Sequence, residues 1–169
     1  MTYGLTSITR DSWYDRGSVL TVSTDYTWSI TPERSRISLA SLTLDEEQTP
    51  VKRSNTGIFA TRPINMSGPH RVRFVSVTQY YLSVTGGYNV SFSKQAPTLD
   101  DWYDSGTPVE VSANHVWNQT SSFRYNLISW ALDGTVYPLT IRENTGKLTT
   151  PTIFMSQYHK VVFNPVTQY

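Results

Sequence analysis

Two aspartates in matching loops are the residues of this chain whose types and spacing come nearest to catalytic chemistry. Asp15 lies in the run Trp-Tyr-Asp-Arg-Gly at 13–17, and Asp104 lies in Trp-Tyr-Asp-Ser-Gly at 102–106. Two carboxylates that share one proton can activate a water molecule for the hydrolysis of a peptide bond. A proton-sharing pair is therefore the first chemical hypothesis for this sequence.

The residues around these aspartates favour a structural role. Asp-Ser-Gly at 104–106 resembles the loop of aspartic proteases, but Arg16 stands where a Ser or Thr hydroxyl should support the second carboxylate. The Trp-Tyr pair ahead of each Asp is also a poor match to the apolar strand that leads into such a loop. Asp can close a turn, and Gly supplies a positive φ. We therefore predict two turns and no catalytic residue.

The tryptophans are candidates for carbohydrate binding, because an exposed indole can stack on a sugar ring. They are Trp13, Trp28, Trp102, Trp117 and Trp130. The first four recur at equivalent positions of the two halves, and a small β-core needs large aromatic side chains to fill it. Trp130 is replaced by Leu42 in the other half, an exchange that suits a core and not a stacking platform. We expect all five to be structural core residues.

The histidines and acidic residues are too scattered to predict a metal site. His70 and His159 recur just ahead of a predicted strand, while His115 has no partner in the first half. None of the three has a carboxylate at metal-ligand spacing. The acidic runs at 45–47 and 100–101 offer fewer oxygen ligands than calcium needs, so both are expected to be solvated turns. We expect no metal, no cofactor and no catalysis.

A long internal repeat determines how these residues are positioned. The run at 13–15 returns at 102–104, which is 89 positions later, and the run at 77–80 returns at 166–169 with the same spacing. A fixed long period indicates tandem copies of one folding unit. We predict two homologous domains, at residues 1–80 and 81–169.

Composition favours strands over helices in both copies. Aromatic residues make up 13% of the chain and charged residues only 16%, and the sequence is rich in the types that are enriched in strands. The second half has short alternating segments at 80–84, 90–92, 109–112, 123–132, 136–141, 152–155 and 159–166. This spacing is typical of a sandwich or barrel. We predict an all-β fold of two tandem small β-sandwich (Ig-like) modules, with a β-grasp-like repeat as the alternative.

The longest predicted strand changes its apolar face partway in both copies. In the first copy, Ile37 and Leu39 alternate before Ala40, Leu42 and Leu44 take over. The second copy repeats the switch at a spacing of 88. A β-bulge inserts one residue and re-aims the side chains that follow. A central strand buried on both faces gives the same pattern, so both explanations stay open.

The first copy has no counterpart of the strand predicted at 81–84. If Tyr3-Gly4-Leu5 matches Tyr88-Asn89-Val90, nothing in the sequence precedes Tyr3 to match that strand. At the other end, the sequence stops at Tyr169, where such a strand would begin. We expect a window from a longer array, or a subunit that receives the missing strand from a neighbour. Either arrangement leaves an open sheet edge, and open edges pair with other strands.

Charge and cysteine content narrow the range of partners. The formal net charge of +1 gives no field to attract nucleic acid or an anionic membrane, and no apolar run is long enough for membrane insertion. Disulfides are excluded because there is no Cys. Sequons at Asn65, Asn89 and Asn118 predict glycosylation sites, and hence an extracellular chain.

Several runs of the second half resemble a known extracellular repeat. They are Tyr-Leu-Ser-Val at 81–84, Gly-Gly-Tyr-Asn-Val at 86–90, Asp-Trp-Tyr-Asp-Ser-Gly-Thr at 101–107, Trp-Ala-Leu-Asp-Gly at 130–134 and His-Lys-Val-Val-Phe at 159–163. They are similar to repeats of archaeal surface-layer and surface-layer-associated proteins, and to the non-catalytic β-modules of thermopsin-like acid proteases. Internalin B-type repeats of bacterial surface proteins are a looser match. The first copy fits less well, because Leu42 and Glu46 replace the Trp and Gly of Trp-Ala-Leu-Asp-Gly.

The resemblance implies rigid, glycosylated spacers or lattice contacts at the cell surface, with no active site of their own. We therefore expect an extracellular structural and interaction module of a surface layer, stalk or filament. Its expected partners are other copies or surface-layer proteins, bound head-to-tail or through edge strands, together with N-linked glycans. The alternatives are a glycan-binding or spacer region of a secreted acid protease, and a virion surface protein.

Overall fold

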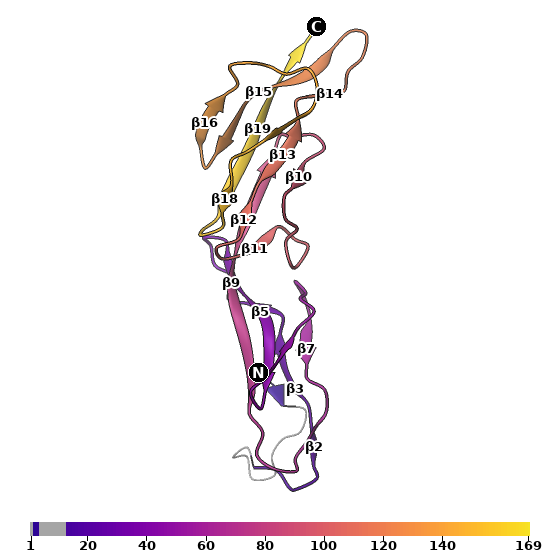
Figure 1. Ribbon diagram of the computed structural model, residues 1–169, viewed down its shortest axis with the longest axis vertical. Coiled ribbons are helices and arrows are strands. Elements are labelled where there is room, and N and C mark those ends of the chain that lie inside the picture. Colours follow the sequence, from indigo (N-terminus) through magenta and orange to yellow (C-terminus); the bar gives the residue numbers. More distant parts are fainter. Residues whose placement is uncertain (1, 4–12) are drawn as a thin grey trace. The chain divides into compact units, whose positions relative to one another are not determined.

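The computed structural model describes residues 2–3 and 13–169, which form strands joined by turns and loops (Figure 1). These described residues contain no α-helix, so the predicted all-β class is confirmed. In the same part of the chain, no helix is long and apolar enough to cross a membrane. The strand content follows from the many β-branched and aromatic residues, which pack well on a pleated surface.

Contacts divide the chain into two compact units. Unit 1 holds Met1–Ile30 and Arg36–Thr78, and unit 2 holds Thr31–Ser35 and Gln79–Tyr169. One long strand, β9 (Val72–Thr85), begins in unit 1 and ends in unit 2.

The main sheet of unit 2 is built on two long antiparallel neighbours, β15 (Arg124–Leu132) and β19 (His159–Gln168) (Figure 1). Strands β14 (Val116–Trp117) and β16 (Thr135–Pro138) pair with β15. The second part of β9 pairs in parallel with β19 and antiparallel with β11 (Trp102–Asp104). The remaining strands form a three-stranded sheet of β10 (Ser91–Phe92), β13 (Val111–Asn114) and β17 (Lys147–Thr149), and a pair of β12 (Pro108–Val109) and β18 (Ile153–Phe154).

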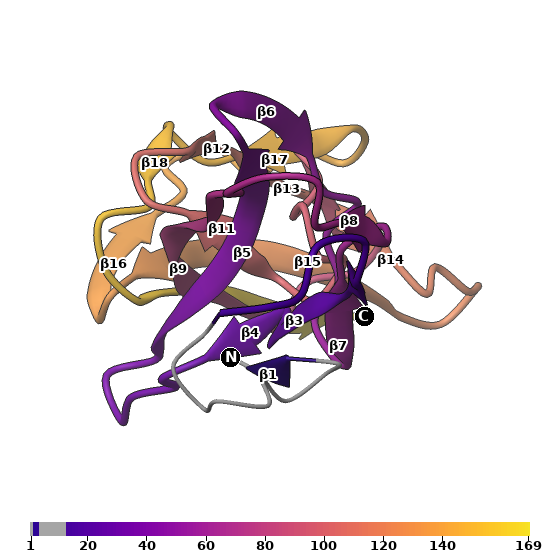
Figure 2. The ribbon, with the colours of Figure 1, turned by 90° about the horizontal axis from the view of Figure 1, so that it is seen from below.

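Unit 1 repeats most of these pairings, but not those that β9 makes with β19 and β11. The central strand β5 (Ser35–Leu44) lies beside β4 (Thr27–Trp28), beside the hairpin partner β6 (Glu47–Pro50) and beside the first part of β9 (Figure 2). A second sheet holds β1 (Thr2–Tyr3), β3 (Val22–Asp25) and β7 (Ile58–Ala60), and β2 (Val19–Leu20) pairs with β8 (Ile64–Asn65).

The strand registers of the two units correspond residue by residue. Ser23 pairs with Ala60 in unit 1, and Ser112 pairs with Thr149 in unit 2, so both partners are shifted by the same 89 positions. Thr2 also pairs with Ser23, as Ser91 pairs with Ser112.

This register corrects the sequence alignment at the start of the chain. Because β1 corresponds to β10, Tyr3 is the counterpart of Phe92 and not of Tyr88. The expected matches of Gly4 and Leu5 lie outside the described residues. The sequence alignment was wrong because it relied on one shared Tyr, whereas the correct match depends on strand pairing, which the sequence does not show.

The long strand of unit 2 has an irregular register in the region where its apolar face changes. The register between β15 and β19 shifts between Leu127 and Ser129. On the two sides of the shift, Asn126 and Leu127 are buried, and then Trp130 and Ala131. The shift is a β-bulge or another irregularity, and adjacent residues are buried on each side of it, so β15 shows signs of both explanations.

Each unit has its own hydrophobic core. The core of unit 2 contains Leu82, Ala96, Tyr103, Val109, Val111, Ala113, Leu127, Trp130, Ile153, Met155, Val161 and Phe163. The core of unit 1 contains Leu39, Leu42 and Val51, with Tyr26, Trp28, Phe59, Val72 and Phe74 half-buried against them. Leu20, Val22 and Ile64 of unit 1 are buried as well.

Candidate functional site

The loops that carry Asp15 and Asp104 are tight turns. The carbonyl of Asp104 accepts a hydrogen bond from the amide of Thr107 at 3.0 Å, and Gly106 has a φ of +81°. Asp15 and Ser18 make the same bond at 3.0 Å, with Gly17 at a φ of +86°. The turn prediction is confirmed at both positions.

The Asp104 carboxylate has a structural partner. Oδ1 accepts a hydrogen bond at 3.0 Å from Nε2 of Gln79, a fully buried side chain of β9. Gly106 then anchors the turn, since its amide donates to the carbonyl of Met155 at 2.9 Å. The corresponding bond in unit 1 runs from Gly17 to Met66 at 3.0 Å.

A histidine and an aspartate form a duplicated contact that we call the His–Asp clamp. His70 Nδ1 lies 2.6 Å from Asp45 Oδ2 in unit 1, and His159 Nδ1 lies 2.6 Å from Asp133 Oδ2 in unit 2. The other carboxylate oxygen accepts the next backbone amide, that of Arg71 at 2.7 Å in unit 1 and of Lys160 at 2.8 Å in unit 2.

The clamp fixes a hairpin tip to the last strand of each unit. Asp45 lies in the turn between β5 and β6, and its amide donates to the carbonyl of Arg71 at 3.0 Å. His70 Nε2 lies 3.0 Å from the carbonyl of Asn65. Both ring nitrogens therefore face acceptors, which only the protonated imidazole can satisfy together.

The charges of the unit 1 clamp stabilise each other. The hydrogen bond to Asp45 raises the pKa of His70 above its usual range. The Arg71 amide, and then His70, lower the pKa of Asp45. The acidic run at 45–47 predicted only a solvated turn, so the pairing of Asp45 with His70 was not predicted. The usable signal was that both members recur in the repeat.

The structure places the tryptophans unequally. Trp13 is 78% exposed, so the expectation of a core position is wrong for this residue. Trp28 and Trp117 are half-buried against the cores of their units. Trp102 is half-buried beside Tyr81, with ring centroids 5.4 Å apart. Trp130 is 7% exposed, and its ring stacks on Tyr137 at 4.4 Å.

The three sequon asparagines, Asn65, Asn89 and Asn118, are all exposed. Asn118 has a φ of +50°, and its counterpart Ser29 has a similar φ of +54°. Thr120, the third residue of its sequon, uses its hydroxyl within the loop and donates to the carbonyl of Phe123 at 3.0 Å. Exposure makes all three side chains accessible to modification.

The remaining polar residues do not come together in one site. Burial, and then the charge of Asp100, raise the pKa of Asp101. Burial also raises the pKa of Tyr103 to about 12. His115 is buried, and its Nδ1 has no hydrogen-bond partner among the described residues. Among residues 2–3 and 13–169, no group of three or more His, Asp or Glu side chains could hold a metal ion.

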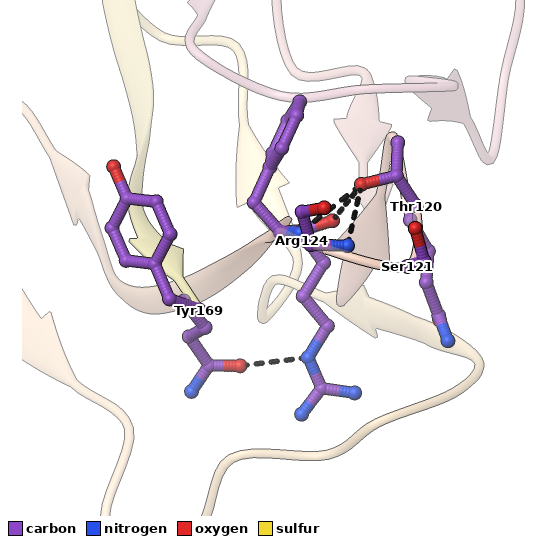
Figure 3. A pocket seen from close by; sticks show the side chains of 8 residues that line it. Thr120, Ser121, Arg124 and Tyr169 are labelled. Atoms are coloured by element: carbon purple, nitrogen blue, oxygen red, sulfur yellow. Dashed lines mark hydrogen bonds between the residues drawn. The ribbon is translucent and has the colours of Figure 1, made fainter.

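A polar hollow of about 320 Å³ lies at one end of unit 2 (Figure 3). It is lined by residues 119–124, Gln168 and Tyr169. Arg124 Nε donates to Gln168 Oε1 at 2.9 Å, and the Thr120 hydroxyl bonds its own loop. These groups can offer hydrogen bonds to a ligand but contain no acid–base pair.

Unit 1 has a more apolar hollow of about 420 Å³, which we call the groove. It is lined by Trp13, Tyr14, Arg16 and residues 66–70. Its walls come from the turn at 15–18 and from the loop that connects β8 to β9. The hydrogen bond between Gly17 and Met66 holds these two walls together.

The counterpart of the groove in unit 2 is filled by a strand. Tyr81, in β9, lies beside Trp102 and stacks on Tyr158 with ring centroids 6.4 Å apart. Trp102 and Tyr158 are the counterparts of Trp13 and Pro69 at the 89-residue spacing. His159 pairs with Leu82 in the parallel ladder. The same wall residues thus surround a strand in one unit and a hollow in the other.

The groove of unit 1 offers a ligand apolar contacts from Trp13, Tyr14 and Met66 and polar groups from Arg16 and His70. The repeated scaffold, with its turns and clamps, positions the groove. No protein-family model matches the chain, and comparison with curated proteins and with solved structures found no match.

Proposed function

We propose that this chain is an extracellular structural and interaction module, made of two small Ig-like β-sandwich modules in tandem. In this proposal the modules bear tension and present contacts in an archaeal-type surface layer, stalk or filament. The features that both units share support it. They are the strand pairings, the Asp-x-Gly turn and the His–Asp clamp, and each of them fixes one segment of the scaffold to another.

The observation that carries the proposal is the parallel pairing of β9 with β19. Residues 82–85 of β9 pair with residues 159–162 of β19, and both strands run in the same direction. The chain enters unit 2 along β9, and β19 is the last strand of the unit. Tension between these two strands therefore shears their hydrogen bonds, so that several bonds must break together.

Force spectroscopy on the full chain tests this role, since forced unfolding reports the unfolding rate. The chain has no native Cys, so Ser76→Cys with Tyr169→Cys attaches handles that shear β9 against β19. The matched control is Ser76→Cys with Gln157→Cys. Its handles apply force at the start of β19, so the pairs between β9 and β19 open one after another. We expect a several-fold higher unfolding force for the first pair. Equal forces would contradict a tension-bearing role.

A second candidate is a glycan-binding or spacer region of a secreted acid protease. The high exposure of Trp13 in the groove favours it, because exposed aromatic rings stack on sugars. A glycan array probed with the full chain and with Trp13→Ala tests it. Binding that Trp13→Ala abolishes would favour the carbohydrate function.

A further inference from the structure

Unit 1 contains a further hollow, of about 510 Å³, which we call the hairpin hollow. One wall is the hairpin of β5 and β6 with the two residues that follow it, and the other is the segment of residues 59–64, from β7 to the start of β8. The hollow therefore lies between strands of the two sheets of this unit. Its volume is in the range of small-molecule sites, about 300–1,000 Å³.

The buried part of the lining is apolar and held in place by packing. Leu42 and Val51 are 7% and 8% exposed and belong to the core of unit 1. The half-buried ring of Phe59 packs edge-on against Tyr26 and Phe74, with ring centroids 6.0 and 6.1 Å apart. A ligand in the hollow thus meets preformed apolar walls that include an aromatic ring.

In unit 2, two aromatic side chains occupy the corresponding place. Leu42 and Thr49 are cross-strand partners in the hairpin of unit 1, and their counterparts Trp130 and Tyr137 are partners in β15 and β16. The rings of Trp130 and Tyr137 stack at 4.4 Å with 15° between their planes. Leu and Thr have no rings, and in unit 1 the hollow lies against them. The repeated scaffold therefore accommodates stacked planar rings at this position.

Positive charge accompanies the hollow. Lys52 and Arg62 line it and are exposed, and Glu47 is the one carboxylate in its lining. The counterparts of the two cations in unit 2 are the uncharged Thr140 and Pro151. A guanidinium binds a carboxylate through two parallel N–H groups, and an ammonium group adds a point charge. The rim of the hollow therefore favours an anionic group on its ligand.

We propose that the hairpin hollow binds a small planar aromatic ligand that carries a carboxylate. The ring lies against Leu42 and Phe59, where unit 2 has its own stacked pair, and the carboxylate faces Lys52 and Arg62. Burial of the ring supplies most of the affinity, because ion pairs at an exposed rim contribute little. This site goes beyond the proposed structural function, since it adds small-molecule binding to unit 1.

Calorimetric titration of the full chain with indole-3-acetate tests the proposal, because the ring that fills the matching place in unit 2 is an indole. We expect saturable binding of one molecule per chain. Tryptamine has the same ring with an ammonium group, so attraction to the two cations becomes repulsion and binding should be about tenfold weaker. Absence of saturable binding overturns the site, and equal binding of tryptamine overturns its preference for an anion.

Thr49→Tyr places the ring of unit 2 in the hollow and should weaken indole-3-acetate binding at least about tenfold. Gln48→Tyr is the matched control. Gln48 is the adjacent residue of β6 and does not line the hollow, so this variant should bind like the wild type. Equal losses in the two variants, or no loss in Thr49→Tyr, overturn the proposed position of the ring.

Arg62→Gln tests the charge without adding bulk. It should weaken indole-3-acetate binding several-fold and leave binding of the neutral indole-3-ethanol unchanged. Methyl NMR signals of Leu42 and Val51 should shift on binding, while those of Val136 in β16 should not. Shifts confined to unit 2, or equal effects of Arg62→Gln on both ligands, overturn the proposal. The force experiment uses only strand pairs of unit 2, so failure here leaves the proposed function standing.

Discussion

At the scale of single residues, the His–Asp clamp of unit 1 predicts a specific pH dependence. The folded pKa of His70 is raised, so its stabilising effect is fully present below the unfolded pKa, about 6.5, and is lost as pH rises through the folded value. The folded pKa of Asp45 is lowered, so its effect is present above about 3.9 and is lost as pH falls through the folded value.

Unit 1 should therefore be most stable in weakly acidic solution, and His70→Gln should remove the decline toward alkaline pH. Urea unfolding of the wild type and of His70→Gln between pH 5 and 9 measures this. An alkaline slope that is the same in both proteins would show that the clamp does not control it.

The turn between β5 and β6 gives a second residue-scale prediction. Glu46 has a φ of +73°, whereas its counterpart in unit 2 is Gly134, at +87°. A side chain in the left-handed region costs about 1–2 kcal/mol, partly offset by the greater unfolded-state freedom of glycine. Glu46→Gly should stabilise unit 1 by about 0.5–1 kcal/mol, and Gly134→Glu should destabilise unit 2. Chemical denaturation of both variants checks the opposite signs.

Trp130 and Leu42 test the core at equivalent positions. Both are 7% exposed. Trp130→Ala should cost about 3–5 kcal/mol and Leu42→Ala about 2–5 kcal/mol, because each leaves a cavity. Denaturation midpoints measure the loss. An unchanged midpoint for Trp130→Ala would contradict a structural role.

Residue identity predicted some of these environments and not others. The exchange of Trp130 for Leu42 correctly indicated a core position, because both side chains are apolar while Leu has no aromatic ring to stack on a ligand. The recurrence of Trp13 did not predict its environment. Its counterpart Trp102 is partly covered by Tyr81 of β9. The described part of unit 1 has no counterpart of that strand segment, and Trp13 is exposed. The His–Asp clamp joins residues 25 and 26 positions apart, a distance at which spacing alone carries no geometric information.

At the scale of elements, long strands were easier to predict than short ones. The alternation of β15 and its interruption near the register shift are visible in the sequence because nine residues of pattern are available. Strands such as β2 and β12 are two residues long and have no period to detect. Their positions depend on partners far along the chain, β8 and β18.

Gly86 provides an element-scale prediction about how β9 ends. It has a φ of +78°, and a Cβ there would meet the carbonyl oxygen of Phe163. Gly106 has a similar φ of +81° but open space around its Cβ position. Gly106→Ala should therefore cost only backbone strain, about 1–2 kcal/mol, while Gly86→Ala should cost at least about 1 kcal/mol more. Thermal unfolding compares the two, and equal losses would contradict the close approach of β9 to β19.

At the scale of the whole molecule, one repeated scaffold encloses two unequal cores. Leu39 and Leu127 are both fully buried, and their amides donate equivalent hydrogen bonds, to Tyr26 at 2.8 Å and to His115 at 2.9 Å. Local geometry alone would give these two amides similar protection from hydrogen exchange. The surrounding units differ, because the aromatic and aliphatic residues near the groove are only half-buried in unit 1. Exchange of the deepest amides reports the stability of the whole cooperative unit.

The amide of Leu39 should therefore exchange with deuterium faster than that of Leu127. Hydrogen exchange followed by mass spectrometry or NMR measures both amides in one sample, so each is the control for the other. Identical exchange rates at the two amides would mean that the half-buried residues near the groove do not weaken unit 1.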